Sequence, residues 1–124
     1  MRMLLDTHVV LWWLVDDPAL SDDIKAMIDE ELDVFVSAAT VWEIGIKQAL
    51  GKLQSPVDLG AQVRDSDLGE LPIRFDHAIA AAALPRVLRD PFDRMLIAQA
   101  RCERLTLVTR DPAVQKYDVD LLPV

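Results

Sequence analysis

Four acidic residues in well-separated stretches of the sequence are the best candidates for chemistry: Asp6, Glu43, Asp93 and Asp111. Four carboxylates within about 4 Å of one another would repel by roughly 4 kcal/mol per pair at an effective dielectric of about 20, so such a cluster needs cations or protons. Ligands that are all oxygen favour Mg²⁺ or Mn²⁺ over zinc. Ions held in this way can activate a water and stabilise the leaving oxygen of a phosphodiester, so these acids point to hydrolysis of a nucleic-acid backbone.

The elements that must position these acids alternate between strand-like and helix-like patterns. Strands are predicted at 2–5, 34–37, 71–73, 105–109 and 120–123, and helices at 7–15, 22–31, 40–50, 56–67, 75–84, 91–104 and, as a short turn or two, 112–117. This alternation predicts an α/β fold, a three-layer α/β/α sandwich with a central, mainly parallel sheet of four to five strands. Ligands bind beyond the carboxyl ends of such strands, which places the four acids at one edge of the sheet.

Length and composition are those of a single globular domain covering residues 1–124. Apolar residues make up 52% of the chain, enough to form a core. The formal charge of −8 argues against a basic, purely electrostatic nucleic-acid binder, although bound divalent cations would reverse the local field. Apolar runs reach only about eight residues where a membrane span needs roughly 20, so no membrane segment is expected. One cysteine and no signal-peptide pattern favour a cytoplasmic protein.

Each acid also has a purely structural explanation. Asp93 would suit the dipole of the helix in whose first turn it lies, and Asp111 before Pro112 could cap the short helix that follows. Asp6 could cap the helix that follows it, since Asp is a preferred N-cap residue. Thr40 and Glu43 match a capping box, and Glu43 could instead pair with Lys47 one helical turn later. Asp90 precedes a proline at a predicted helix start, which favours a capping role for that residue.

The two histidines and the cysteine carry weaker signals. His77 lies on an amphipathic helix and is expected to be a partly exposed packing residue, while His8 could lie near the pocket because it follows Asp6 so closely. Neither histidine stands in a zinc-ligand spacing. Cys102 is expected in the core.

Three tryptophans and three arginines flank the acids in sequence. For Trp12, Trp13 and Trp42, packing between helices is favoured over stacking on bases. The arginines are candidates for contacts with substrate phosphates, because a metal site still needs donors for the neighbouring phosphates: Arg89, Arg94 and Arg110.

Four segments together resemble the conserved motifs of PIN domains, particularly the VapC toxins of bacterial toxin–antitoxin pairs. The segments are LLDTH at 4–8 followed by Leu11 and Trp12, SAATVWEI at 37–44 with Lys47, RDPFDRMLIAQA at 89–100, and LVTRD at 107–111. The third segment is the most specific. The resemblance runs from the first predicted strand to the last.

The resemblance implies a PIN fold, Mg²⁺- or Mn²⁺-dependent endoribonuclease activity, a homodimer and inhibition by a VapB-type antitoxin. It makes Asp6 and Asp93 the principal metal ligands, with Glu43 and Asp111 completing the set. Thr7 and Thr109 become supporting hydroxyls around these ligands. One position departs from the pattern, because many members have His before the RDPFDR run where this chain has Leu88.

Other functions remain open at this point. A haloacid-dehalogenase-type phosphatase would need a second Asp two residues after Asp6, where His8 stands, and a receiver domain would need its acceptor Asp near mid-chain. A glycine-rich phosphate loop is excluded by the number and placement of the four glycines. A non-catalytic protein-binding module with this fold, or a nuclease that acts on single-stranded DNA, stays an alternative.

Overall fold

The computed structural model describes residues 1–53 and 58–124, and its centre is a five-stranded parallel sheet. The strands are β1 (Met3–Leu5), β2 (Val34–Ser37), β3 (Gly69–Leu71), β4 (Thr106–Thr109) and β5 (Leu121–Pro123). They lie in the order β3-β2-β1-β4-β5. The first strand is therefore central, with Met3 opposite Val34 on one side and opposite Thr106 on the other. The predicted parallel sheet is confirmed.

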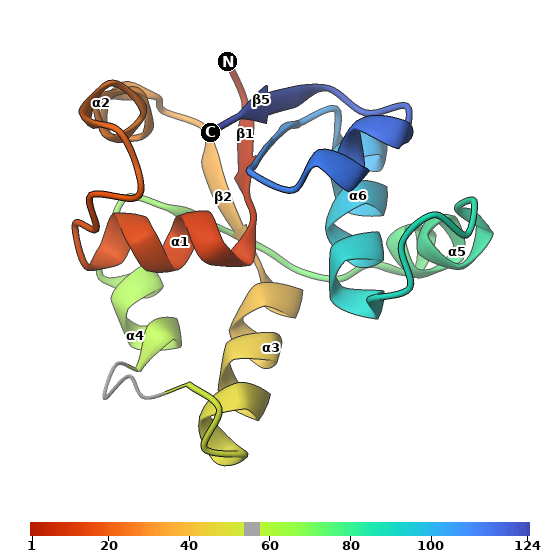
Figure 1. Ribbon diagram of the computed structural model, residues 1–124, viewed down its shortest axis with the longest axis horizontal. Coiled ribbons are helices and arrows are strands. Elements are labelled where there is room, and N and C mark those ends of the chain that lie inside the picture. Colours follow the sequence, from red (N-terminus) through yellow and green to blue (C-terminus); the bar gives the residue numbers. More distant parts are fainter. Residues whose placement is uncertain (54–57) are drawn as a thin grey trace.

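Six α-helices and one 3₁₀ helix connect the strands within the described residues. They are α1 (Thr7–Leu14), α2 (Asp22–Glu30), α3 (Ala38–Ala49), α4 (Leu59–Arg64), α5 (Phe75–Ala83), α6 (Pro91–Glu103) and the 3₁₀ helix η1 (Pro112–Lys116). In Figure 1, α1, α2 and α4 lie on one side of β1 and β2, and α5 and α6 lie on the other. The predicted α/β/α arrangement is confirmed. No helix in the described parts of the chain is both long and apolar enough to cross a bilayer.

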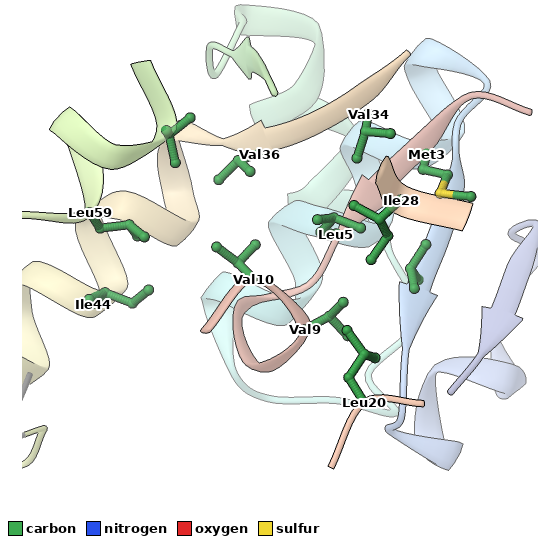
Figure 2. Packing of buried hydrophobic residues seen from close by; sticks show 12 residues of the cluster. Met3, Leu5, Val9, Val10, Leu20, Ile28, Val34, Val36, Ile44 and Leu59 are labelled. Carbon is green, nitrogen blue, oxygen red and sulfur yellow. The ribbon is translucent and has the colours of Figure 1, made fainter. Parts of the chain in front are cut away.

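Each face of the sheet has its own hydrophobic core, because side chains alternate along a strand. Met3 and Leu5 point into the cluster that includes Val9, Ile28 and Val36, and Figure 2 shows these residues converging from β1, α1, α2 and β2. Leu4, between them, belongs to the opposite cluster, which holds buried residues of α6. The central strand is therefore buried on both sides.

Several helices begin at side-chain caps, and the cap of α3 differs from the prediction. Ser37 caps α3 by accepting a hydrogen bond from Ala39 N–H at 3.0 Å, so the predicted capping box of Thr40 and Glu43 is wrong. Asp58 caps α4, while the predicted start of that helix at residue 56 lies outside the described residues.

The edge strand β3 runs from Gly69 to Leu71, whereas the prediction placed it at 71–73. The reason is a close packing contact with the neighbouring strand. A Cβ on Gly69 would lie 2.7 Å from the ring of Phe35. Only glycine lets the edge strand approach the ring this closely, which ties the pairing to residue 69.

Two predictions about burial are wrong, and both concern the α5–α6 side. His77 is completely buried: its Nδ1 accepts the Arg74 N–H at 3.0 Å, and its Nε2 lies 2.7 Å from Glu103 Oε1. Cys102 is exposed, since α6 turns Leu96, Ile97 and Ala100 toward the core instead.

A buried glutamine ties the helices to the sheet. Gln99 of α6 is fully buried, and its Oε1 accepts the hydroxyl of Ser37 at 2.6 Å. Its Nε2 donates to the carbonyl of Pro72 at 3.3 Å. Because Ser37 also caps α3, one side chain joins α6, the end of β2 and the start of α3.

Candidate metal centre

Asp6 follows the central strand and is held by its neighbours on two sides. Its Oδ1 accepts the Val9 N–H at 2.9 Å, which makes it the N-cap of α1, and its Oδ2 accepts the hydroxyl of Thr109 at the end of β4. Burial raises the pKa of Asp6 above its usual range, and these two hydrogen bonds hold back part of the rise. The capping explanation is therefore correct, and the same carboxylate also lies at the carboxyl ends of two adjacent strands.

Glu43 lies on α3 with only 6% of its surface exposed. Its Oε1 accepts the Thr7 hydroxyl at 2.7 Å, and its Oε2 receives Lys47 Nζ at 2.9 Å. The predicted pair with Lys47 is thus present, one helical turn along. A buried carboxylate needs such partners, because burial without them costs several kcal/mol.

Asp111 joins the same edge through Thr109. Its backbone N–H donates to Thr109 Oγ1 at 3.1 Å, and its Oδ1 accepts the Ala113 N–H at 2.9 Å, capping η1. The hydroxyl of Thr109 therefore accepts from the Asp111 backbone while it donates to Asp6. Two of the candidate acids are linked by one side chain.

Asp93 in the first turn of α6 shows that the four acids share one electrostatic environment. Burial and like charges raise its pKa to about 7, and the charges responsible, in order of effect, are those of Asp90, Glu43, Asp111 and Asp6. Asp90 itself caps α6 through Phe92 N–H at 2.8 Å, as predicted. The structure thus brings all four candidates, and Asp90, close enough for their charges to act on one carboxyl.

The donor set fits a hard divalent cation. All the candidate side chains offer oxygen, the ligand atom that Mg²⁺ and Mn²⁺ prefer. Burial is the largest cause of the raised pKa of Asp93, and the like charges around it add to the rise; a divalent cation would offset those charges. Asp6, Glu43, Asp93 and Asp111 are the residues that could hold such an ion.

A second group of possible metal ligands, on α5 and α6, is a structural contact. Asp76, His77 and Glu103 bring ligand atoms within 4.8 Å of one another, a closeness that no three of the four candidate acids reach in the described structure. However, the Nδ1 lone pair of His77 already accepts the Arg74 N–H. Nε2 must then carry the ring hydrogen and donate it to Glu103, so it has no lone pair for a metal. This group is a cross-link between α5 and α6.

Two of the three candidate arginines make hydrogen bonds within the protein. Arg94 donates to the carbonyls of four residues at 2.8–3.1 Å, namely Ala81, Leu84, Pro85 and Leu88. Arg110 donates to the carbonyls of Val124 and Ala19, and its guanidinium lies 4.5 Å from the centre of the Trp12 ring. Both arginines therefore hold the main chain in place. Arg89 is exposed and keeps the possibility of a phosphate contact.

The remaining aromatic residues near the acids differ in exposure. His8 is exposed and lies beside Trp12, with ring centres 5.8 Å apart. Trp12 and Trp13 are partly buried, and Trp13 donates its indole N–H to Asp29 at 3.0 Å. Trp42 is 62% exposed, although its ring contacts that of Phe92 on α6, so the predicted packing between helices describes only part of its surroundings.

Sequence reasoning missed Gln99, although a signal was present. Gln99 stands between Ala98 and Ala100, directly after the apolar pair Leu96 and Ile97. A polar side chain on the buried face of a helix is favoured only when it has hydrogen-bond partners. Its position therefore indicated a buried polar link, which the structure shows to be the one with Ser37.

Comparison with known proteins agrees with this geometry. The family model described as PIN domain matches residues 3–120. Ribonuclease VapC22 of Mycobacterium tuberculosis is 29% identical over 118 residues, covering 93% of this chain and 91% of that protein.

Solved structures share the fold at lower identity. The VapBC2 complex of Rickettsia felis, bound to a DNA fragment from its promoter, has a TM-score of 0.74 at 14% identity, with 99% of this chain and 98% of that chain covered. FitAcB of Neisseria gonorrhoeae has a TM-score of 0.68 at 22% identity, covering 98% and 96%. The sequence resemblance is confirmed at the level of the family: the chain belongs to the PIN domain family.

Proposed function

We propose that this protein is a metal-dependent endoribonuclease and the toxin of a VapBC-type toxin–antitoxin pair. The observation that carries the proposal is the convergence of four carboxylate charges on Asp93, whose pKa they help to raise to about 7. Such repulsion between carboxylates destabilises the folded protein unless a bound cation offsets it. A relative that matches most of the chain is named a ribonuclease, which supports RNA as the substrate class.

Asp6, Glu43, Asp93 and Asp111 would hold Mg²⁺ or Mn²⁺. When bound, the ion supplies an activated water and stabilises charge on the phosphate that is attacked. The chain's own residues prepare the ligands. Thr109 orients Asp6, and Thr7 orients Glu43, each through a hydrogen bond from its hydroxyl.

The ammonium group of Lys47 forms an ion pair with Oε2 of Glu43 at 2.9 Å. Part of the charge of Glu43 is thereby balanced within the protein, and the remaining charge of the four acids is left for an ion. Because Glu43 is nearly buried and doubly bonded, its orientation is preset before any ligand arrives.

The proposal extends to partners and compartment. The relatives with this fold include VapBC complexes, which favours a VapB-type antitoxin as the inhibitor of this chain. We further propose a homodimer that works in the cytoplasm. Sedimentation of the purified protein, alone and with the product of a neighbouring small gene, tests the assembly: one copy per particle at micromolar concentration contradicts the dimer.

The proposal is tested by cleavage of total RNA and defined tRNAs with Mg²⁺, Mn²⁺ or EDTA. Asp93→Asn is compared with Asp118→Asn, which removes one charge from an exposed aspartate near the chain's end. We expect cutting that needs metal, survives in Asp118→Asn and is lost in Asp93→Asn. Cutting that persists in EDTA contradicts the metal mechanism. Absence of cutting on RNA with every metal contradicts the ribonuclease, and a parallel single-stranded DNA substrate then separates a DNA nuclease from a non-catalytic binding module.

A further inference from the structure

Trp42 is an exposed aromatic residue that is nevertheless held in place. It shows 62% of its surface, and its ring meets the ring of Phe92 edge-on, with centres 5.3 Å apart and planes at 70°. Edge-to-face contact is a favourable geometry for two aromatic rings. The indole is therefore supported from one direction and open from another.

The two aromatic residues immediately precede two candidate metal ligands in sequence. Trp42 immediately precedes Glu43 on α3, and Phe92 immediately precedes Asp93 on α6. Consecutive side chains of a helix point about 100° apart, so Glu43 can turn inward while Trp42 turns outward at the same level. The aromatic pair thus bridges the two helices next to the carboxylates.

Open space adjoins the tryptophan. Trp42 forms part of the wall of a hollow of about 950 Å³ between α3, α4 and β3, together with Val41, Leu71 and Pro72. Acidic side chains also line the hollow, namely Asp58, Asp65 and Glu70, and its arginine, Arg64, is already paired with Glu70 at 3.0 Å. A phosphate is therefore disfavoured in the hollow, whereas the uncharged face of a base is not.

The charge of the whole chain gives uncharged contacts added value in a nuclease. At −8, the protein repels a polyanion at long range, so cations at the carboxylates, a local contact such as that of Arg89 and contacts that carry no charge must outweigh this repulsion. Stacking of a base on an aromatic ring supplies about 10- to 100-fold in affinity per base and does not depend on charge. Trp42 offers such a ring beside the reacting centre.

We propose that Trp42, supported by Phe92, stacks against one base of a single-stranded RNA substrate next to the phosphate that is cut. The inference rests on the proposed ribonuclease function and adds the form of its substrate. Bases within an A-form duplex already stack on each other, so only an unpaired base can offer its face to the indole.

The test measures cleavage of single-stranded RNA oligonucleotides of about 12 nucleotides, a length within the usual site sizes for single strands. Trp42→Ala should raise KM about tenfold or more and change kcat little, because the ring touches the substrate beside the reacting atoms. Trp42→Phe should retain most of the affinity, and Trp42→Leu, which keeps apolar bulk without a ring face, should behave like the alanine variant. Each variant should unfold at nearly the wild-type temperature, since the side chain is mostly exposed.

Phe75→Ala is the matched control. Phe75 is 85% exposed and begins α5, whose buried His77 binds Glu103 at the end of α6. Asp93 lies near the other end of α6, about 15 Å away along the helix axis. This variant should leave KM unchanged.

An abasic scan then identifies the contact. Replacing one nucleotide at a time by an abasic unit should weaken wild-type binding about tenfold at a single position. The same replacement should cause no further loss in Trp42→Ala, because the two changes remove one interaction.

Three results overturn the inference. The first is an abasic penalty that is equal in the wild type and in Trp42→Ala, and the second is a Trp42→Leu variant with the KM of the wild type. The third is an unchanged KM in Trp42→Ala, with or without a change in its sedimentation; a change in sedimentation would point to a protein contact of the ring. If the wild type cuts no RNA, the proposed function fails, and anisotropy of the same labelled oligonucleotides still decides the stacking. Binding that depends on Trp42 would support it, and binding that does not, or no binding, would overturn it.

Discussion

Replacing Asp93 by Asn should stabilise the metal-free protein at neutral and alkaline pH. The folded chain keeps the pKa of Asp93 near 7, whereas an ordinary aspartate has 3.8. A difference of about 3 in pKa corresponds to about 4 kcal/mol if it acts in full. Asp93 is partly exposed, and screening by solvent reduces this to about 1–2 kcal/mol.

The pH dependence follows from which state holds the proton. Between pH 3.8 and about 7 the unfolded chain has released the Asp93 proton while the folded chain retains it, so this residue makes stability fall as pH rises. Below 3.8 both states are protonated and the residue has no effect. Above about 7 the full penalty is present. Asparagine keeps the shape of the side chain and never takes up the charge.

The assay is thermal unfolding in EDTA at pH 4.5 and pH 8, followed by circular dichroism. At pH 8 the Asp93→Asn variant should melt about 3–8 °C above the wild type, and at pH 4.5 the two should nearly coincide. Asp118→Asn controls for the loss of one charge from an acidic chain and should shift neither value appreciably. Mg²⁺ should raise the melting temperature of the wild type more than that of Asp93→Asn. The reasoning is refuted if the Asp93→Asn variant melts below the wild type at pH 8. It is also refuted if the variant melts above the wild type by the same margin at pH 8 and at pH 4.5.

Three further substitutions test other contacts. Arg94→Met should destabilise the fold by about 2–4 kcal/mol in urea unfolding, because four main-chain carbonyls lose their donor; normal stability with weakened RNA binding would instead support a phosphate contact. Gln99→Leu should cost about 1–3 kcal/mol by the same measurement, since the buried Ser37 hydroxyl loses its acceptor, and an unchanged midpoint would argue against the link. Thr109→Val should raise the pKa of Asp6 further, because it removes a hydrogen bond that stabilises the ionised carboxylate. An unchanged titration of the Asp6 carboxyl in NMR would contradict this.

The fold and the corner of acids could be predicted because both depend on local patterns. Short apolar runs predicted the strands, and the rule that parallel strands end at one edge placed Asp6 and Asp111 together. The second turn of α3 and the first turn of α6 then bring Glu43 and Asp93 to the same edge. None of these steps required knowledge of how distant side chains pack.

The predictions that failed depend on which face of a helix is buried. The sequence of α5 is rich in alanine, so its pattern did not reveal that His77 faces inward toward Glu103. Cys102 lies next to Arg101 near the end of α6, where a change of one residue turns a side chain from the core to the solvent. Arg94 binds carbonyls of a loop whose path no local pattern describes. These outcomes are decided by tertiary contacts.

The order of the strands has a consequence for the protein's synthesis. The central strand β1 pairs with β4, whose residues are made long after those of β1, since Met3 lies opposite Thr106. At about 5–20 residues per second, the nascent chain spends several seconds with Asp6 already exposed but Thr109 and Asp111 not yet made. A nascent chain that has not yet reached residue 106 therefore lacks one of the two strands that flank its central strand, and it cannot assemble the acidic corner.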